Sequence, residues 1–193
     1  MNPLRHIPTI CCFLALGMLS LSFRMPMAKR KLMADKSATT ITYAMRHPMH
    51  TWEGVSRDVT CAVVYNDETN RIENVAAVVK VASFDSQNSN RDSHALESTE
   101  ALKYPNITFS SQDIQPGDGN TLTIRGNMTF HNVTRPMTIQ ATRKEASGKL
   151  TIDGNFDFKL TDFKIEKPSL MMVPVEDEVK MRFVFVFKMP ANS

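Results

Sequence analysis

The segment EVKMRFVFVFK, residues 178–188, carries a large apolar side chain at every second position. Successive side chains of a β-strand point to opposite faces, so a period of two predicts a strand with one buried face. Seven further segments show the same period, and together they predict an all-β chain of eight strands. The other seven are residues 41–45, 55–65, 75–81, 107–110, 121–130, 137–142 and 150–160.

The regular spacing of these segments, with turn residues between them, suits an antiparallel sandwich or barrel. Ser147-Gly148, for example, predicts a tight hairpin between the sixth and seventh strands. A closed eight-stranded barrel is either filled by its own side chains or holds one small ligand. Rows of Phe and Met fit a packed core as well as an adaptable apolar cavity. Periodicity therefore leaves both interiors open.

One segment breaks the alternation. Residues 92–102 (DSHALESTEAL) contain no Gly or Pro and predict a short helix between the third and fourth strands. Asp92 is a suitable N-cap, and the step into Pro105 ends the segment, since a residue before proline leaves the α region.

The first 22 residues are predicted to be a secretory signal outside the fold, because Arg5 precedes an apolar run over residues 7–23. The chain is therefore expected to be exported, for example to the periplasm. An uncleaved membrane anchor is the alternative, since basic residues follow the run directly. A later start at Met25, Met27 or Met33 also stays open. The remaining chain is interpreted as a basic linker (23–38), a barrel (39–189) and a tail (190–193).

Composition and motifs argue against several functions. The net charge of +3, from 23 basic and 20 acidic residues, is too balanced for a dedicated nucleic-acid binder. Seven glycines make a glycine-rich phosphate loop improbable, and no hydrolase or metalloprotease motif occurs. His47, His50 and His94 are more simply polar or turn residues than metal ligands. We therefore expect no catalytic residue, no metal site and no cofactor.

Several strings together resemble the YceI family. They are SFDSQNSNRDSHALESTEALKYPNITF (83–109), LTIRGNMTFHNVTRPMTIQ (122–140), LTDFKIEKPSLMMVPVEDEVKMRF (160–183) and ITYAMRHPMHTWEG (41–54). Four segments in the family's order cover most of the chain. Relatives often have Gly where this chain has Asn132, and Asn tolerates the positive φ that such a turn needs.

The resemblance implies a lipocalin-like antiparallel barrel with a short covering helix. It also implies a binding protein, not an enzyme, whose apolar pore holds an amphiphile such as the polyisoprenoid chain of a quinone. The polar end of that ligand is expected at the mouth, beside His47, Arg91 and His94. The predicted pore lining consists of Met45, Trp52, Phe109, Met128, Phe130, Phe156, Phe158, Met181, Phe183 and Phe185.

Two alternatives to a lipid carrier remain. One is an enzyme that acts on the bound lipid through His47 or His94. The other is a solid barrel that binds a protein partner on its outer surface, where Val184 and Val186 interrupt a basic strand face. The expected partner is a hydrophobic small molecule or lipid. A transient membrane contact and a homodimer are compatible with this interpretation.

Overall fold

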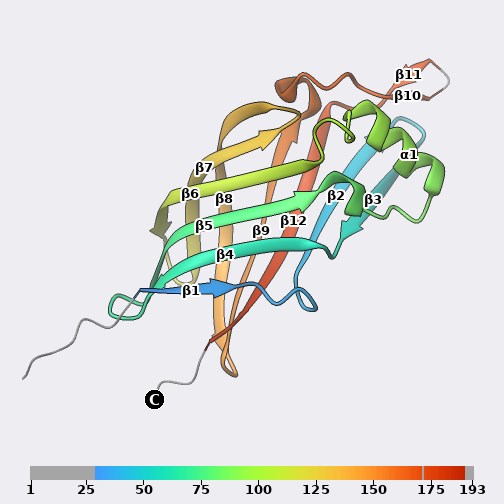
Figure 1. The fold of residues 1–193 in the computed structure, drawn as a ribbon. Coiled ribbons are helices and arrows are strands. Elements are labelled where there is room, and N and C mark those ends of the chain that lie inside the picture. The colour runs from blue at the N-terminus through green and yellow to red at the C-terminus, as the bar shows by residue number, and fades with distance from the viewer. Residues whose placement is uncertain (1–28, 171, 190–193) are drawn as a thin grey trace, which may run out of the picture.

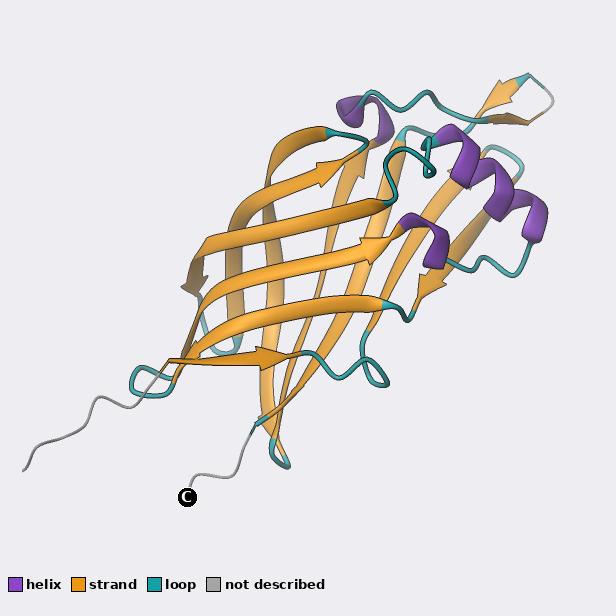
Figure 2. Cartoon of the chain, in the orientation of Figure 1, coloured by secondary structure: helices purple, strands orange, loops and turns teal. Residues whose placement is uncertain are grey.

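The computed structural model describes residues 29–170 and 172–189. The predicted signal (1–22), the first part of the predicted linker (23–28) and the tail (190–193) lie outside the described residues. The described chain forms a curled sheet with a short helix across one end (Figure 1, Figure 2). Its elements are β1 (Lys29–Met33), β2 (Thr40–His47), β3 (His50–Ser56), β4 (Val59–Asn66), β5 (Arg71–Lys80), η1 (Val81–Ser83), α1 (Ser89–Ser98), β6 (Asn106–Pro116), β7 (Thr121–Phe130), β8 (Val133–Ala146), β9 (Lys149–Lys159), η2 (Leu160–Phe163), β10 (Ser169–Leu170), β11 (Val173–Pro174) and β12 (Glu178–Lys188).

Ten strands form one antiparallel sheet in the order β1-β4-β5-β6-β7-β8-β9-β12-β2-β3, and β10 and β11 form a separate ribbon. The predicted antiparallel barrel is confirmed, with its helix between the third and fourth predicted strands. The predicted number of strands in the sheet was eight, and the structure corrects it to ten.

The two additional strands have separate causes. The predicted strand 55–65 is two strands, because the chain leaves β3 at Arg57–Asp58 and continues as β4 beside β5. Residues 29–33 of the predicted linker form β1, which pairs along its whole length with β4. Only Leu32 of β1 is buried, so the basic composition of this stretch hid a strand at the edge of the sheet.

Short links tie the two edges of the curled sheet together. After β1, the Asp35 N–H donates to the Val186 carbonyl of β12 (2.7 Å), and Ala34 forms an isolated antiparallel bridge with Phe187 of the same strand. Near the other end, Val55 of β3 exchanges two backbone hydrogen bonds with Asp85, at 2.9 and 3.0 Å. These links close the barrel without a continuous ladder between its edge strands.

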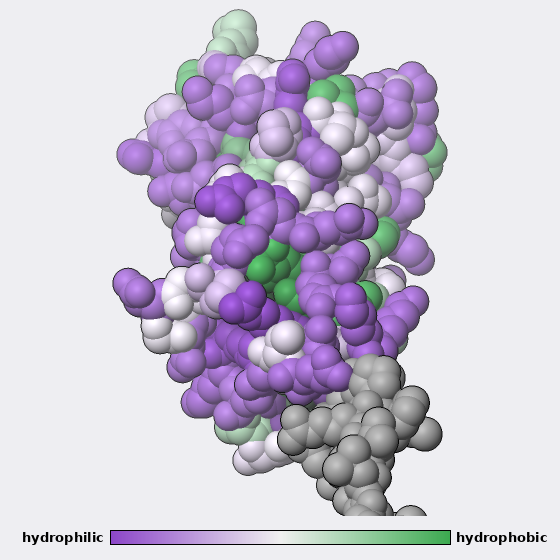
Figure 3. Space-filling model, turned by 90° about the vertical axis from the view of Figure 1, so that its left-hand side faces the viewer, coloured by the Kyte–Doolittle hydropathy of each residue, from purple (hydrophilic) through white to green (hydrophobic). Residues whose placement is uncertain are grey.

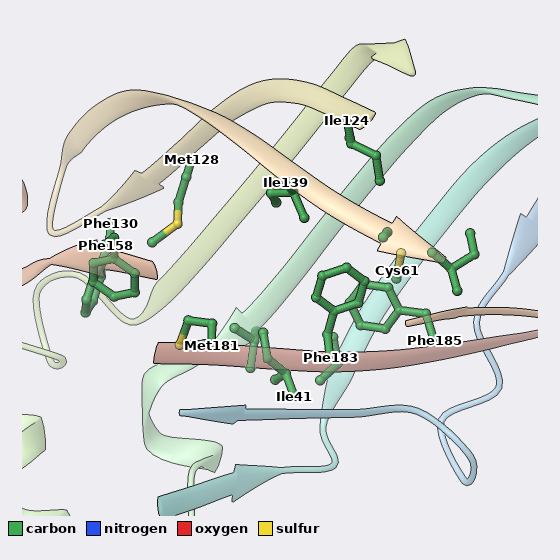
Figure 4. Close-up of a cluster of buried hydrophobic side chains, with 14 of the residues drawn as sticks. Ile41, Cys61, Ile124, Met128, Phe130, Ile139, Phe158, Met181, Phe183 and Phe185 are labelled. Carbon is green, nitrogen blue, oxygen red and sulfur yellow. The ribbon is translucent and has the colours of Figure 1, made fainter. Parts of the chain in front are cut away.

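The core lies inside this curl. On β12, Val179, Met181, Phe183, Phe185 and Phe187 are all buried, as the period of two predicts. Figure 4 shows Phe183 and Phe185 on one side of Met181 and the Phe130–Phe158 pair on the other. The outer faces of the strands are mostly polar, and the face in Figure 3 shows a small central apolar area and scattered apolar residues among polar side chains.

Strand glycines make room for aromatic rings inside the barrel, and Gly154 and Gly126 are two examples. A Cβ on Gly154 would lie 2.7 Å from Cζ of Phe183, and a Cβ on Gly126 would lie 2.6 Å from Cζ of Phe109. Both are shorter than a van der Waals contact, so a side chain at either position forces its ring to move. The sequence pattern gave no hint of these two pairings.

The residues in two hairpin turns have the backbone conformations that their sequence predicts. Ser147 and Gly148 have φ of 52° and 68°, which confirms the tight turn between β8 and β9. His131 and Asn132 have φ of 49° and 59° between β7 and β8. Two successive positive φ values are typical of a two-residue hairpin turn, so Asn132 serves where relatives often have Gly.

The helix is displaced from its predicted bounds of 92–102 and spans Ser89–Ser98. Its N-cap is Asn88, whose side chain accepts from the Arg91 N–H at 3.1 Å. The predicted cap, Asp92, instead accepts from the Ser86 N–H at 3.2 Å and so fixes the loop that precedes the helix.

Candidate functional site

The barrel interior contains two chambers of very different size. The outer chamber, beneath α1, has a volume of about 600 Å³. The inner chamber, deeper in the barrel, has a volume of about 70 Å³ and entirely apolar walls. Ligand pockets for small molecules occupy about 300–1,000 Å³, so only the outer chamber is in that range.

The chambers are stacked along the barrel axis, because β7 and β9 each pass from one chamber to the other between two inward-facing residues. On β7, Met128 lines the inner chamber and Phe130 the outer one. On β9, Phe156 and Phe158 divide in the same way. Met181 lines both chambers, as does one other residue, Ile107.

The inner chamber is small because aromatic rings fill most of it. The rings of Phe183 and Phe185 stack with centroids 4.9 Å apart, and Phe156 lies 6.4 Å from Phe183. The Phe183 ring occupies the space above Gly154. The barrel at this level is therefore close to a packed core.

The outer chamber is roofed by α1, which is held at both ends. The Asp92 carboxylate fixes the loop before the helix, and the Glu100 carboxylate after it contacts Nε2 of His131 at 2.6 Å. Nδ1 of His131 lies 3.1 Å from the Phe163 carbonyl of η2, and its ring packs edge-on against Tyr104. These contacts position the roof over the cavity.

Side chains from β2, β3 and α1 form an aromatic and cationic wall in this chamber. In the β2–β3 register, Met45 lies opposite Trp52, and His47 lies opposite His50. The ring of His50 is 5.6 Å from that of His47 and 5.3 Å from that of Trp52. The guanidinium of Arg91 lies 5.2 Å from the centre of the Trp52 ring, a cation–π distance.

His47 has a structural role in this wall. Its side chain is buried, its Nδ1 accepts from the Met49 N–H at 3.3 Å, and its Nε2 lies 3.3 Å from the Val173 carbonyl. A nitrogen that accepts leaves the other to donate, so the hydrogen bonds assign the proton to Nε2. His47 thereby joins the β2–β3 turn to β11, and both its ring nitrogens have backbone partners.

The structure divides the predicted pore residues between the two chambers instead of placing them along one tunnel. The outer chamber is lined by Met45, His47, Trp52, Arg91, His94, Phe130, Phe158 and Met181. The inner chamber is lined by Phe109, Met128, Phe156, Met181, Phe183 and Phe185.

The sequence pattern missed several walls of the outer chamber. Tyr43 shares a strand face with Met45 and could have been included, whereas Phe84, Leu96 and Val175 lie in segments without alternation. Phe84 packs edge-on against Tyr43 with centroids 5.4 Å apart. Burial raises the pKa of the Tyr43 hydroxyl, and the charge of Asp92 adds to that effect.

Cys61 lies on the wall of the inner chamber, and burial raises its pKa to about 12. At pH 8 only about one thiol in 10,000 is ionised, and the thiolate is the reactive form. We expect iodoacetamide to modify native Cys61 over a hundredfold more slowly than the same residue in urea. The readout is the mass of the peptide containing Cys61, since the chain also has Cys11 and Cys12. Equal rates in both conditions would contradict the buried position.

Within residues 29–170 and 172–189, no three His, Cys, Asp or Glu side chains come together as metal ligands. In the same part of the chain, no helix has the length and apolar character needed to span a bilayer.

Comparisons with known proteins agree with this architecture. The model of the YceI-like domain family matches residues 32–187. A UPF0312 protein of Enterobacter sp. (strain 638) is 30% identical over 105 residues, which are 52% of this chain and 54% of that protein. Protein YceI of Salmonella newport is 27% identical over 118 residues, which are 59% of this chain and 61% of that protein. The matches thus span less than two thirds of these relatives' length.

Solved structures share the fold at low sequence identity. BcnA of Burkholderia cenocepacia superposes with a TM-score of 0.72 at 22% identity, covering 79% of this chain and 98% of that one. A polyisoprenoid binding domain from Saccharophagus degradans, implicated in plant cell wall breakdown, superposes with a TM-score of 0.64 at 10% identity. That match covers 84% of this chain and 100% of the domain.

Proposed function

This chain belongs to the YceI-like family, and we propose that it binds an amphiphilic lipid with an isoprenoid chain in the outer chamber. The observation that carries the proposal is a cavity of about 600 Å³ between α1 and the barrel. A structural relative from Saccharophagus degradans is a polyisoprenoid binding domain, which supports the same class of ligand.

Apolar burial supplies the binding energy in this proposal. The chamber is walled by Phe130, Phe158 and Met181 on the barrel side and by Ala95 and Leu96 on the helix. Each methylene that leaves water contributes about 0.8 kcal/mol, so a chain of a few isoprene units gains on the order of 10 kcal/mol before the costs of association. No buried charge is needed to hold such a chain.

The polar end of the ligand is proposed to lie near Arg91, His50 and His94. His50 and His94 are exposed, and all three side chains line the outer chamber. Arg91 donates to the Ser86 carbonyl at 3.4 Å, a long contact that leaves most of its donors available to a ligand oxygen. His47 is proposed to hold the β2–β3 turn in place beside the ligand, because backbone groups occupy both its ring nitrogens.

We further propose that the ligand is held without conversion and that the protein is an exported carrier. The hydrogen bonds of His47 support binding without conversion, because they engage the nitrogen that a general base would use.

A transient membrane contact is supported by Met49 (73% exposed) and Met172 (96% exposed), which flank the His47–Val173 link. A homodimer stays a prediction from the sequence.

Trp52 provides a direct test, because it is the chain's one tryptophan and lines the outer chamber. Titration with farnesol is expected to shift its emission to shorter wavelength, since the ligand replaces water against the ring. A five-carbon alcohol with the same hydroxyl end is the control and should cause no shift at equal concentration. An unchanged spectrum up to the solubility limit of farnesol would contradict binding in this chamber.

A further inference from the structure

The boundary between the two chambers is a single layer of side chains. Met181 and Ile107 are the residues that line both chambers, and they come from β12 and β6. Met181 is only 4% exposed, and in the strand registers it lies opposite Tyr43 on one side and Phe156 on the other. Figure 4 places it between the Phe130–Phe158 pair and the Phe183–Phe185 stack.

This layer forms the end of the usable cavity. The space beyond it, about 70 Å³, is about half the volume of an apolar cavity of roughly 150 Å³ that is known to bind benzene, and is therefore too small for an isoprene chain to extend into. The layer itself is thin, because two side chains reach both chambers. Met is also unbranched and flexible, so its terminal thioether fills a gap that a shorter side chain would leave open.

We propose that Met181 and Ile107 form a floor that sets the longest apolar chain the protein accepts. This inference rests on the proposed lipid binding in the outer chamber. A chain that ends above the floor gains burial with every added carbon. A longer chain meets the floor and must fold back or leave its polar end outside the mouth, so its additional carbons add no affinity.

The test compares prenyl alcohols of increasing length on wild type and on Met181→Ala. For wild type, affinity is expected to rise with each isoprene unit and then level off or fall. In Met181→Ala the two chambers join, so the limit moves to longer chains and the first alcohol beyond the wild-type limit gains at least about tenfold in affinity, equivalent to two added methylenes in the new space.

Two further variants keep the test decisive. Ile107→Ala opens the same floor at a residue that is only partly buried, so it serves if Met181→Ala folds poorly. Met128→Ala is the matched control, because Met128 lines only the inner chamber and its removal leaves the floor in place. If wild type, Met181→Ala and Ile107→Ala all show the same limit on chain length, the proposal that Met181 and Ile107 set this limit is wrong. Failure of every alcohol to bind any variant would instead overturn the proposed lipid binding.

Discussion

Ala95→Trp is expected to abolish lipid binding while leaving the barrel folded. Ala95 lies on α1 and lines the outer chamber, so an indole at this position projects into the space proposed for the ligand. If the indole excludes only four carbons of the ligand, the loss is about 3 kcal/mol, or roughly a hundredfold in affinity. The indole also narrows the space left for the ligand carbons that it does not exclude. The measured loss of affinity should therefore exceed a hundredfold.

Ser93→Trp is the matched control for this experiment. Ser93 is on the same helix and exposed, and it lies outside the lining of the outer chamber. Isothermal titration with farnesol should give wild-type affinity for Ser93→Trp and no measurable heat of binding for Ala95→Trp. Binding of equal strength to both variants would show that the ligand occupies some other part of the molecule.

Phe187→Ala is expected to destabilise the protein by about 3–5 kcal/mol. Phe187 is 0% exposed and pairs in register with Leu150, which is also 0% exposed. It also forms the bridge to Ala34, which helps to tie β1 and β4 to β12. The substitution therefore leaves a cavity where the edges of the sheet are joined, and the fully buried neighbours have little freedom to close it.

Urea unfolding followed by circular dichroism measures this effect. Val184→Ala is the control, because Val184 lies on the same strand but on its outer, half-buried face. Its loss should be below about 1.5 kcal/mol, since only part of a small side chain is withdrawn from contact. If the two variants lose equal stability, the two faces of β12 do not differ in the way the structure describes.

The fold could be predicted from the sequence largely because period two is a local property. The apolar positions of β12 appear as such in residues 178–188, and all five are buried. The exceptions have identifiable causes. β1 lies at the edge of the sheet and buries only Leu32, so it gave little apolar signal. Arg57 interrupts the alternation where the chain passes from β3 to β4, and an interruption of one residue does not show that the strand has changed partners.

The shape of the interior could not be predicted in the same way. Alternation assigns a side chain to the inner face but does not say how completely opposing side chains fill the space between them. Phe183 and Phe130 belong to the same kind of inward row, yet one helps to fill the inner chamber and the other lines the outer one. The difference depends on Gly154, which lets the Phe183 ring lie against the sheet, and on the helix that roofs the chamber.

The roles of the polar residues also depended on distant contacts. Arg91 and His94 lie on the lining of the outer chamber, but no pattern in the sequence places Trp52 5.2 Å from Arg91. His47 was predicted as a ligand contact and lies on the lining of the outer chamber, but its backbone partners at Met49 and Val173 did not follow from the sequence. Val173 is far away in the sequence, so this link could be found only in three dimensions.

A crystal structure of the protein grown with farnesol tests the central claim most directly. Ligand density is expected between α1 and the Phe130–Phe158 pair, with the isoprene end resting on Met181 and the hydroxyl directed toward Arg91. The contrary result is a complex in which the outer chamber holds no ligand, either because protein side chains have closed it or because farnesol lies on the outside of the barrel.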